Sequence, residues 1–495
     1  MKKNLYVTTA IPYANAKPHI GNALDYLLAD IWKRYQEQQG KVVRFQVGTD
    51  EHGNKIASKA QQAGLTPQEF TDQMVGNFIS LTDKVGAKYT DFIRTTDAHH
   101  VQAVQYIWQK LQPYIYKGSY EGWYCVGHEA FFTDKDVEAT GGVCPDHQTQ
   151  YEKISEENYY LKTSQFSQQI KVAIETNRLQ IVPEFRKNEF LELIKDGLKD
   201  VSISRPKKNL SWGVPVPNDP DQIMYVWIDA LANYITVLGY PDNEEWKSYW
   251  PADIQVIGKD ILRFHAGIWP AMLLGLELPL PKKLLVHGFI NVGGEKISKT
   301  VGNVVDPVEI IDNYGVDAFR YFFARHIPTQ DDGDFTWEKF ETAYNTELSN
   351  DLGNLVQRVA SMITRYQAGV IGDINRGEHD IQLFREAMEA IEFNRALDEI
   401  WVSVRAANKY LENVKPWEVA KKREADPESA DHLAQILVTS AGTLLQIAEL
   451  LRPFMPTTAE KISATFSEGV IRDQGPLFPR LYLHTEDPRQ AKTDA

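Results

Sequence analysis

The chain has 495 residues, more than one ordinary hydrophobic core accommodates, so we expect about two to four domains. Hydrophobic residues make up 43% and charged residues 24%, an ordinary globular composition, and the net charge of −14 excludes a general attraction to nucleic acid but not a local basic face. No apolar run reaches the roughly 18 residues of a membrane-spanning helix. Two cysteines exclude a disulfide scaffold and suit a reducing cytoplasm.

The first 50 residues alternate strand and helix patterns. Residues 5–11 are apolar and β-branched, which predicts a strand. Apolar residues then recur at the spacing of one helix face: Leu24, Leu27, Leu28, Ile31 and Tyr35. Gly40 ends this helix, and residues 42–47 predict a second strand. The order predicts a βαβ unit and therefore a parallel sheet.

The rest of the chain predicts three further kinds of structure. Residues 223–228, 254–257 and 284–292 predict more strands, whereas amphipathic segments at 350–367, 381–411 and 432–452 predict a helix bundle. Between them, residues 116–205 combine short aromatic strands with a Cys/His cluster, which predicts an inserted domain. We therefore predict an α/β fold with a Rossmann-type parallel sheet in two halves (1–115 and 206–270), an insert (116–205), a linking region (271–345) and a C-terminal α-helical bundle (346–495).

Two short polar stretches are candidates for a phosphate site. In residues 18–22 (PHIGN), Pro18 suits a first helical turn, Gly21 permits close backbone approach, and His19 adds a hydrogen-bond donor near free backbone N–H groups. In residues 295–304 (EKISKTVGNV), Lys296 and Lys299 can offer two cations to a polyphosphate. Each stretch alone also fits a plain alternative, a capping histidine or a solvated loop.

Together these stretches resemble the HIGH and KMSKS motifs of class I aminoacyl-tRNA synthetases. The surrounding residues resemble the signatures of methionyl-tRNA synthetases, at 9–15 (TAIPYAN), 47–53 (VGTDEHG), 225–230 (YVWIDA), 257–265 (IGKDILRFH) and 285–291 (LVHGFIN). The resemblance extends from residue 5 to about residue 456. The sequence departs from the motifs at Asn22, Ile297 and Thr300, but Asn22 can still donate a hydrogen bond and both lysines remain.

The resemblance implies an enzyme that uses ATP to convert L-methionine to methionyl-adenylate and transfers it to the 3′ end of tRNA(Met). The two sheet halves become the catalytic domain, 116–205 a connective domain and 346–495 the anticodon-binding domain. The insert is short compared with the editing domains of the leucine, isoleucine and valine relatives, which favours methionine. The alternatives are another class I synthetase, or a catalytically inactive synthetase-like tRNA-binding protein.

The resemblance also implies roles for individual residues. ATP is expected at His19, Gly21, Asn22, Lys296 and Lys299, of which His19, Asn22 and the two lysines assist catalysis together with Mg²⁺. Asp50 is expected to hold the methionine ammonium, and the side-chain pocket comprises Ile11, Tyr13, Trp227, Ala230, Leu231, Tyr234 and His265. Trp227 and Tyr234 lie seven residues apart, so they also fit a core stripe on a helix.

Two Cys-x-x-His pairs in the insert have the spacing of a structural zinc knuckle. Cys125, His128, Cys144 and His147 would form a tetrahedral site with two sulfur and two nitrogen ligands. The family often has four cysteines here, and several members have lost the metal. The alternative is a knuckle that packs two buried thiols without zinc.

Four residues of the helical region are expected at the tRNA anticodon: Asn354, Arg358, Asn408 and Trp417. Arg358 also fits a solvated helix position, and Trp417 after Pro416 also fits a helix anchor. No further tRNA-binding domain follows, so we expect a cytoplasmic monomer that does not use a membrane.

Overall fold

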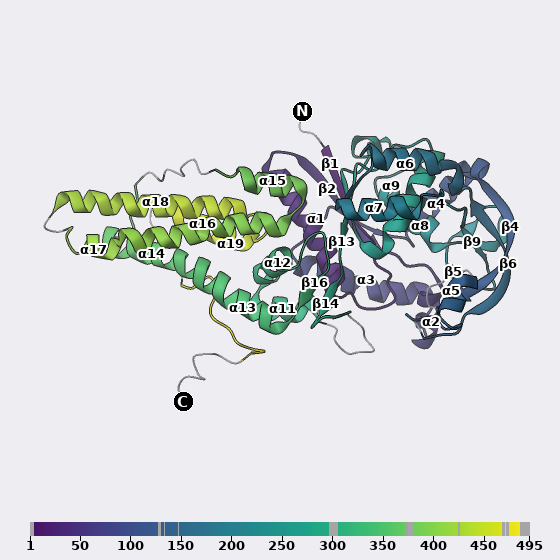
Figure 1. The fold of residues 1–495 in the computed structure, drawn as a ribbon, viewed down its shortest axis with the longest axis horizontal. Helices are drawn as coiled ribbons and strands as arrows, with labels where there is room; N and C mark the ends of the chain where they lie inside the picture. The colour runs from purple at the N-terminus through teal and green to yellow at the C-terminus, as the bar shows by residue number, and fades with distance from the viewer. Residues whose placement is uncertain are drawn as a thin grey trace.

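The computed structural model describes residues 4–126, 130–132, 134–146, 148–296, 305–372, 374, 380–423, 426–467, 471 and 475–485. A six-stranded sheet lies near the middle of the molecule, in the order β3-β2-β1-β12-β13-β7 (Figure 1). Its strands are all parallel: β1 (Asn4–Thr9), β2 (Val42–Thr49), β3 (Asp91–Arg94), β7 (Gln180–Val182), β12 (Ile254–Gly258) and β13 (Lys283–His287). The predicted α/β class with a parallel sheet is confirmed.

Helices cover both faces of this sheet. Successive side chains of β1 therefore enter different hydrophobic cores. Leu5 and Val7 join one hydrophobic cluster and Tyr6 joins another. The helices around the sheet are α1 (Ile20–Gln38), α2 (Asn54–Gln62), α3 (Pro67–Lys84), α4 (Ala98–Lys110), α6 (Ser167–Glu175), α7 (Glu184–Leu193), α8 (Val226–Leu231), α9 (Asn233–Thr236) and α10 (Trp269–Gly275). Short 3₁₀ turns lie at Gln112–Tyr114, Thr163–Phe166, Glu244–Ser248 and Lys259–Ile261, and a π turn at Phe264–Ile268.

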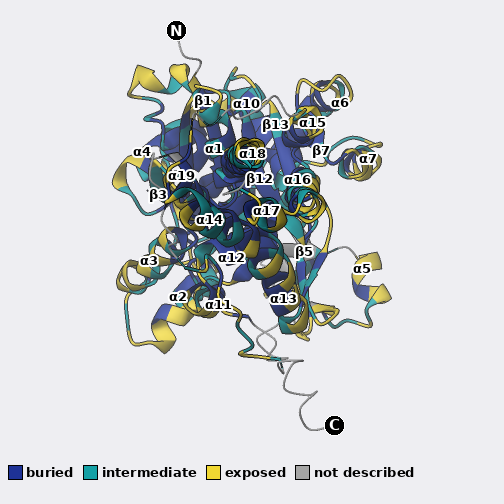
Figure 2. Ribbon diagram, turned by 90° about the vertical axis from the view of Figure 1, so that its left-hand side faces the viewer, coloured by how far each residue is buried: buried dark blue, intermediate teal, exposed yellow. Residues whose placement is uncertain are grey.

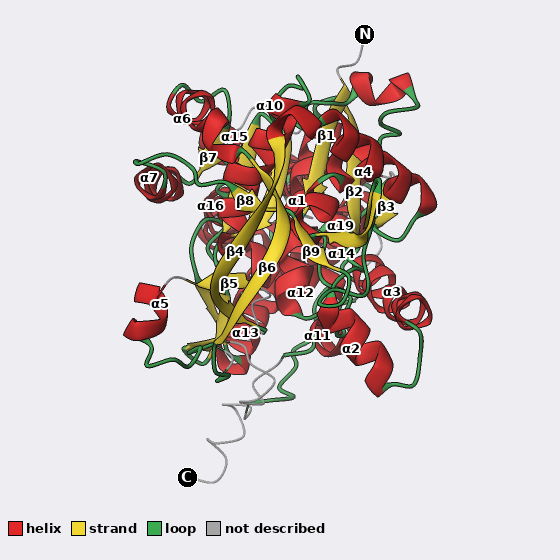
Figure 3. Cartoon of the chain, turned by 90° about the vertical axis from the view of Figure 1, so that its right-hand side faces the viewer, coloured by secondary structure: helices red, strands yellow, loops and turns green. Residues whose placement is uncertain are grey.

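The insert is built on a long antiparallel ribbon. β4 (Ile115–Cys125) and β6 (Glu152–Leu161) pair along ten residues, flanked by β5 (Ala130–Phe132) and β8 (Val201–Ser202), with α5 (Asp134–Ala139) nearby (Figure 3). The segment between β6 and β8 returns to the centre of the molecule, because β7 pairs with β13 and forms the edge of the six-stranded sheet. That sheet therefore draws one strand from within residues 116–205.

Two predicted strands are wrong in their extent. Residues 223–228 split: β11 (Asp219–Met224) joins the small antiparallel sheet with β9 (Ser204–Pro206) and β10 (Pro215–Val216), and Val226 already belongs to helix α8. Six apolar residues fit a strand and a buried helix equally well, so their pattern could not separate the two.

Residues 284–292 also split, between β13 of the central sheet and β14 (Ile290–Val292) of another. The break is at Gly288, where an added Cβ would lie 2.2 Å from the carbonyl carbon and 2.3 Å from the oxygen of Asp331. This close approach turns the chain into a second small sheet of β14, β15 (Glu295–Lys296) and β16 (Gly333–Phe335).

The helical region forms an elongated bundle at one end of the molecule (Figure 1). Its elements are α11 (Pro307–Tyr314), α12 (Val316–Arg325), α13 (Trp337–Ala343), a π-helical stretch (Tyr344–Gly353), α14 (Asn354–Gln367), α15 (Gln382–Ala390), α16 (Phe393–Val414), α17 (Pro416–Ala420), α18 (Pro427–Leu451) and α19 (Pro456–Ser467). The segment predicted at 381–411 is two helices, because Ile391 adopts a left-handed φ of 59° between α15 and α16.

Buried residues run continuously from the sheet into the bundle, around α1, α12 and α14 (Figure 2). Among the described helices, only α18 is long and apolar enough to suit a membrane span by composition, and 56% of its most apolar window is buried inside the structure. A helix of membrane-spanning composition was not expected from the sequence, because threonine, serine, glycine and glutamine interrupt the apolar residues of α18.

Candidate active site

The central sheet changes winding direction between β1 and β12. The chain proceeds from β1 to β2 and β3 on one side, whereas β12, β13 and β7 lie on the other. The two strands remain joined beyond β1, where the Ala10 N–H donates to the Val256 carbonyl at 3.0 Å. Crevices at the carboxyl ends of strands at such a switch point are where open α/β sheets bind ligands. Many of the candidate residues follow these strand ends.

His19 caps helix α1 and is exposed. Its Nδ1 accepts the Gly21 N–H at 3.0 Å, and its own N–H donates to Asn22 Oδ1 at 3.0 Å, so His19 and Asn22 form a reciprocal capping box. Because Nδ1 accepts, a neutral His19 carries its proton on Nε2. The cap uses the amide oxygen of Asn22 and leaves the amide NH₂ as the group that can donate to a ligand.

Helix α1 is tied to the end of β13 by an ion pair. His287 Nε2 lies 2.7 Å from Asp25 Oδ1, and His287 Nδ1 lies 2.8 Å from the Gly288 carbonyl. Burial lowers the pKa of His287, but the Asp25 carboxylate outweighs it, so that pKa lies above its ordinary value of 6.5. The turn at His19 and the strand that leads to Lys296 are thereby connected.

Lys296 lies on a hairpin that follows β13. β15 pairs with β14, with Lys296 opposite Asn291, and the turn between them uses Gly293 and Gly294 at φ values of 63° and 82°. Asp334 Oδ1 accepts the Gly294 N–H at 2.7 Å and fixes this turn. Lys299 lies outside the described residues.

Asp50 follows β2 and is buried. Its backbone pairs with the segment after β1: the Asp50 N–H donates to the Pro12 carbonyl, and the Ala14 N–H donates to the Asp50 carbonyl, each at 2.9 Å. Tyr13 and Asp50, which come from two different loops, are therefore held side by side.

An aromatic cluster unites three of the residues expected to bind methionine. Tyr234 Oη lies 2.7 Å from His265 Nε2, and His265 Nδ1 lies 3.0 Å from the Ile261 carbonyl. Because a carbonyl only accepts, Nδ1 carries the proton and Nε2 accepts from the Tyr234 hydroxyl. Burial lowers the pKa of His265 to about 4, so this ring is neutral near pH 7.

Trp227 contributes a flat apolar wall to the same cluster. Its ring stacks on Phe264 with centroids 3.7 Å apart and planes 7° apart, and its edge faces His265 at 6.3 Å. Ala230 and Leu231 are buried on the same helix, but Leu231 packs into the hydrophobic cluster that contains Tyr6. Ile11 lies against the end of β2, where its Cγ2 would be 3.0 Å from a Cβ added at Gly48.

A buried carboxylate shared by two histidines, Asp229, was not predicted from the sequence. His52 Nδ1 lies 2.5 Å from one oxygen of Asp229, and His100 Nε2 lies 2.8 Å from the other. Burial raises the pKa of Asp229, but the two histidines outweigh this effect and lower that pKa to about 2. This group ties the Asp50–His52 turn to α8, which carries Trp227.

Other missed residues differ in how visible they are in sequence. Four of them fall inside the quoted signatures: Phe264, Asp229, His52 and His287. The signatures therefore offered a signal for these four residues. Arg94 and His100 belong to no motif. Their contacts arise only when β3 and α4 are placed beside β2.

The cysteines of the insert are both buried and share one small hydrophobic cluster with Val137 and Tyr151. The Gln148 N–H donates to the Cys144 carbonyl at 2.8 Å, which closes a tight turn after Cys144. His128 and His147 lie outside the described residues. Within the described part of the chain, no group of three or more His, Cys, Asp or Glu is placed to hold a metal ion.

The residues expected at the anticodon lie on α14, α16 and α17, and α17 is at the end of the bundle away from the sheet (Figure 1). The Arg358 guanidinium lies 5.8 Å from the centroid of the Trp417 ring, and Asn408 Nδ2 donates to the Asp351 carbonyl at 2.9 Å. Asn354 is exposed at the start of α14. Three helices, α14, α16 and α17, therefore supply this set.

Family models match almost the whole described fold. One, described as tRNA synthetases class I (M), matches residues 5–156 and 146–360, and another, the anticodon binding domain of methionyl tRNA ligase, matches residues 361–474. A methionine–tRNA ligase of Caldanaerobacter subterraneus is 43% identical over 93% of this chain and 74% of its own length. A methionine–tRNA ligase of Brucella melitensis is 40% identical over 93% of this chain and 91% of its own length.

Solved structures give the same result. Mycobacterium tuberculosis methionyl-tRNA synthetase in complex with methionyl-adenylate superimposes with a TM-score of 0.90 at 35% identity, covering 97% of this chain and 100% of that one. The apo form of the mycobacterial enzyme gives a TM-score of 0.84 at 32% identity, covering 97% and 99%. The chain therefore belongs to the methionine–tRNA ligase family, the class I aminoacyl-tRNA synthetases that use ATP to join methionine to tRNA.

Proposed function

We propose that the turn at His19, the turn at Asp50 and the aromatic cluster around Tyr234 form one active site for both steps of methionine–tRNA ligation. The observation that carries this proposal is their arrangement around the switch point between β1 and β12. In the first step, the methionine carboxylate attacks the α-phosphate of ATP, and the bond to pyrophosphate breaks. In the second, a ribose hydroxyl at the 3′ end of tRNA(Met) attacks the carbonyl of the adenylate, and AMP leaves.

The first step requires positioning and positive charge rather than an enzyme nucleophile. The His19 Nε2–H and the Asn22 amide NH₂ bind ATP phosphates at the start of α1, where the helix dipole favours anions. Lys296 and Lys299 neutralise the charge that develops on the pyrophosphate. Mg²⁺ bound with ATP would supply further positive charge to the phosphates.

Methionine occupies the space between the Asp50 turn and the aromatic cluster. The Asp50 carboxylate binds the ammonium. Ile11, Tyr13, Trp227 and Ala230 line the apolar part of the slot, and Leu231 supports α8 from the core side. The Tyr234–His265 pair lines the far end of the slot, where the thioether sulfur can sit against the ring edges.

The anticodon loop of tRNA(Met) binds at the other end of the molecule. Trp417 offers a ring on which an unstacked base can lie, and Arg358 holds that ring by a cation–π contact. Asn408 fixes the end of the π-helical stretch before α14 through its bond to the Asp351 carbonyl. Asn354 is exposed and free to reach a base edge from the start of α14.

We further propose a structural zinc ion in the insert. Cys125 and Cys144 fit half of such a site, because both thiols are buried and lie in one cluster. Cys125, His128, Cys144 and His147 would hold the ion, which would stabilise the ribbon of β4 and β6. The chain is proposed to act as a cytoplasmic monomer without a membrane.

Two variants test the proposal by separating its two ends. His19→Ala removes a phosphate donor, so ATP–pyrophosphate exchange should fall by about 10²-fold. Trp417→Ala should leave exchange unchanged but lower kcat/KM for tRNA charging by about tenfold, the loss expected from one stacked base. Each variant is the control for the other. If Trp417→Ala lowers exchange as well, its role is structural, and normal exchange in His19→Ala removes His19 from the phosphate site.

A further inference from the structure

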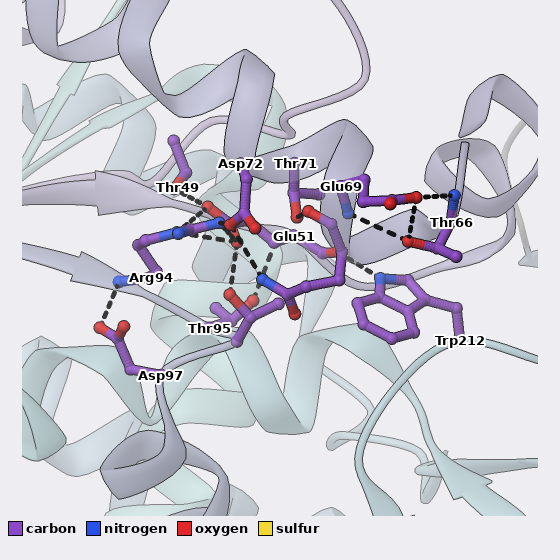
Figure 4. A network of polar contacts seen from close by, with 12 residues as sticks. Thr49, Glu51, Thr66, Glu69, Thr71, Asp72, Arg94, Thr95, Asp97 and Trp212 are labelled. Atoms are coloured by element: carbon purple, nitrogen blue, oxygen red, sulfur yellow. Dashed lines mark hydrogen bonds and ion pairs between the residues drawn. The ribbon is translucent and has the colours of Figure 1, made fainter. Parts of the chain in front are cut away.

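Glu51, the residue after Asp50, is a fully buried carboxylate with many partners (Figure 4). The Arg94 guanidinium binds both of its oxygens, with Nε at 2.8 and 3.1 Å and Nη2 at 2.9 Å. The hydroxyls of Thr49 and Thr96 donate to it at 2.6 and 2.5 Å. A buried carboxylate is stable only when it is paired and hydrogen-bonded in this way.

The backbone of the same turn is fixed from two further sides. The Glu51 N–H donates to Thr95 Oγ1 at 2.9 Å, and the Trp212 indole N–H donates to the Glu51 carbonyl at 2.6 Å. The Gly53 N–H donates in turn to the Trp212 carbonyl at 3.0 Å. Thr95 and Trp212 therefore fix the backbone of the residues that follow Asp50 by hydrogen bonds.

Arg94 is well placed to act on Asp50 through Glu51. Thr49 is paired with Arg94 in the ladder between β2 and β3, so the guanidinium and the turn belong to adjacent strand ends. Burial lowers the pKa of Arg94, but its bonds to Glu51 and Asp72 outweigh this effect and raise it, so the side chain is always charged. The contact with Asp72 lies at the surface, where that carboxylate is 50% exposed, and contributes little.

We propose that Glu51 and Arg94 are positioning residues that set where Asp50 meets the methionine ammonium. Consecutive Cα atoms are held about 3.8 Å apart, so a shift of Glu51 moves Asp50 directly. Arg94 acts by holding Glu51, and its loss lets the turn relax. The Tyr234–His265 pair and the cap at His19 are held by contacts that do not include Arg94. The inference rests on the role proposed above for Asp50.

The chain offers a matched control in Arg44. Its guanidinium binds both oxygens of Asp91 at 2.8 and 2.7 Å, across the same pair of strands, and its side chain is 17% exposed against 23% for Arg94. Arg44→Lys therefore costs a comparable ion pair between β2 and β3 without touching the Asp50 turn.

The experiment compares L-methionine with 4-(methylthio)butanoate, which has the same carbon–sulfur skeleton but no ammonium. In pyrophosphate exchange, Arg94→Lys should raise the KM for methionine by about tenfold. The inhibition constant of 4-(methylthio)butanoate, the KM for ATP and kcat should stay within about twofold of the unsubstituted chain. Thr96→Val removes one hydroxyl from Glu51 without removing a charge, and should raise the KM for methionine by about threefold. Arg44→Lys should change neither the KM for methionine nor the inhibition constant of 4-(methylthio)butanoate.

Asp50→Asn separates failure of the inference from failure of the role of Asp50. If Asp50→Asn weakens both ligands equally, Asp50 does not bind the ammonium, and the inference falls with that role. Suppose instead that Asp50→Asn weakens the binding of methionine only. The positioning role of Glu51 and Arg94 is then overturned if Arg94→Lys and Thr96→Val weaken the binding of both ligands equally, or of neither. If all three variants weaken the binding of methionine but not of 4-(methylthio)butanoate, the positioning role is supported.

Discussion

The position of the proton on His265 sets the polarity of the pocket proposed for the methionine side chain. Because Nδ1–H is engaged by the Ile261 carbonyl, Nε2 must accept, and the Tyr234 hydroxyl is the group that donates to it. The hydroxyl and the ring therefore fix each other, and both side chains are buried. Neither group carries a charge near pH 7, because burial lowers the pKa of His265 to about 4.

Tyr234→Phe tests this pair. It removes the donor that orients the buried His265 ring, so the KM for methionine should rise by roughly tenfold at an unchanged KM for ATP. The preference for methionine over norleucine, which has a methylene in place of sulfur, should also fall. An unchanged ratio of the two kcat/KM values would show that the hydroxyl does not read the thioether.

Single residues of this site differ in how far the sequence predicts them. His19 and Asp50 stand in motifs, and the structure places both beside the switch point, although their roles stay predictions. Glu51 stands in the same motif, but its partner Arg94 lies 43 residues away and meets it only through the register of β2 and β3. Long-range polar pairs of this kind leave no local pattern.

Among the elements, α1 and β13 are joined by one ion pair whose strength depends on pH. The pKa of His287 is raised in the folded chain, so the Asp25–His287 pair stabilises the fold fully below the unfolded pKa of about 6.5 and is lost as pH rises through the folded pKa. Stability gained from this pair must therefore decline with rising pH above about 6.5.

Asp25→Asn should remove that dependence. Its Tm should lie furthest below that of the unsubstituted chain near pH 6, and the difference should shrink as the pH approaches about 9. Thermal unfolding at a series of pH values measures it. A difference that is constant, or that grows with pH, would mean that His287 is not charged in the pair.

Two element boundaries at Gly288 and Ile391 could not be predicted from the sequence. The break at Gly288 exists because the Asp331 backbone passes within the space of a side chain, and the break at Ile391 exists because the chain turns between α15 and α16. The β1–α1–β2 unit was predictable because its periodicities are local and strong.

At the scale of the whole molecule, one continuous hydrophobic core joins the central sheet to the helical bundle. Arg320 lies where the sheet domain meets the bundle: it pairs with Asp30 of α1 at 2.8 Å and donates to the carbonyls of Val85, Pro453 and Phe454 at 3.2, 2.8 and 2.7 Å. The α/β class and the helical C-terminal region could be predicted from periodicity, whereas this joint could not, because its partners are backbone oxygens from distant segments.

The central claim is that this fold activates methionine with ATP at the switch point of its sheet. ATP–pyrophosphate exchange, measured with each proteinogenic amino acid in turn, tests it most directly. We expect exchange with L-methionine to exceed that with any other amino acid by about 10²-fold or more. No exchange with methionine, or exchange with another amino acid at a comparable rate, would contradict the account.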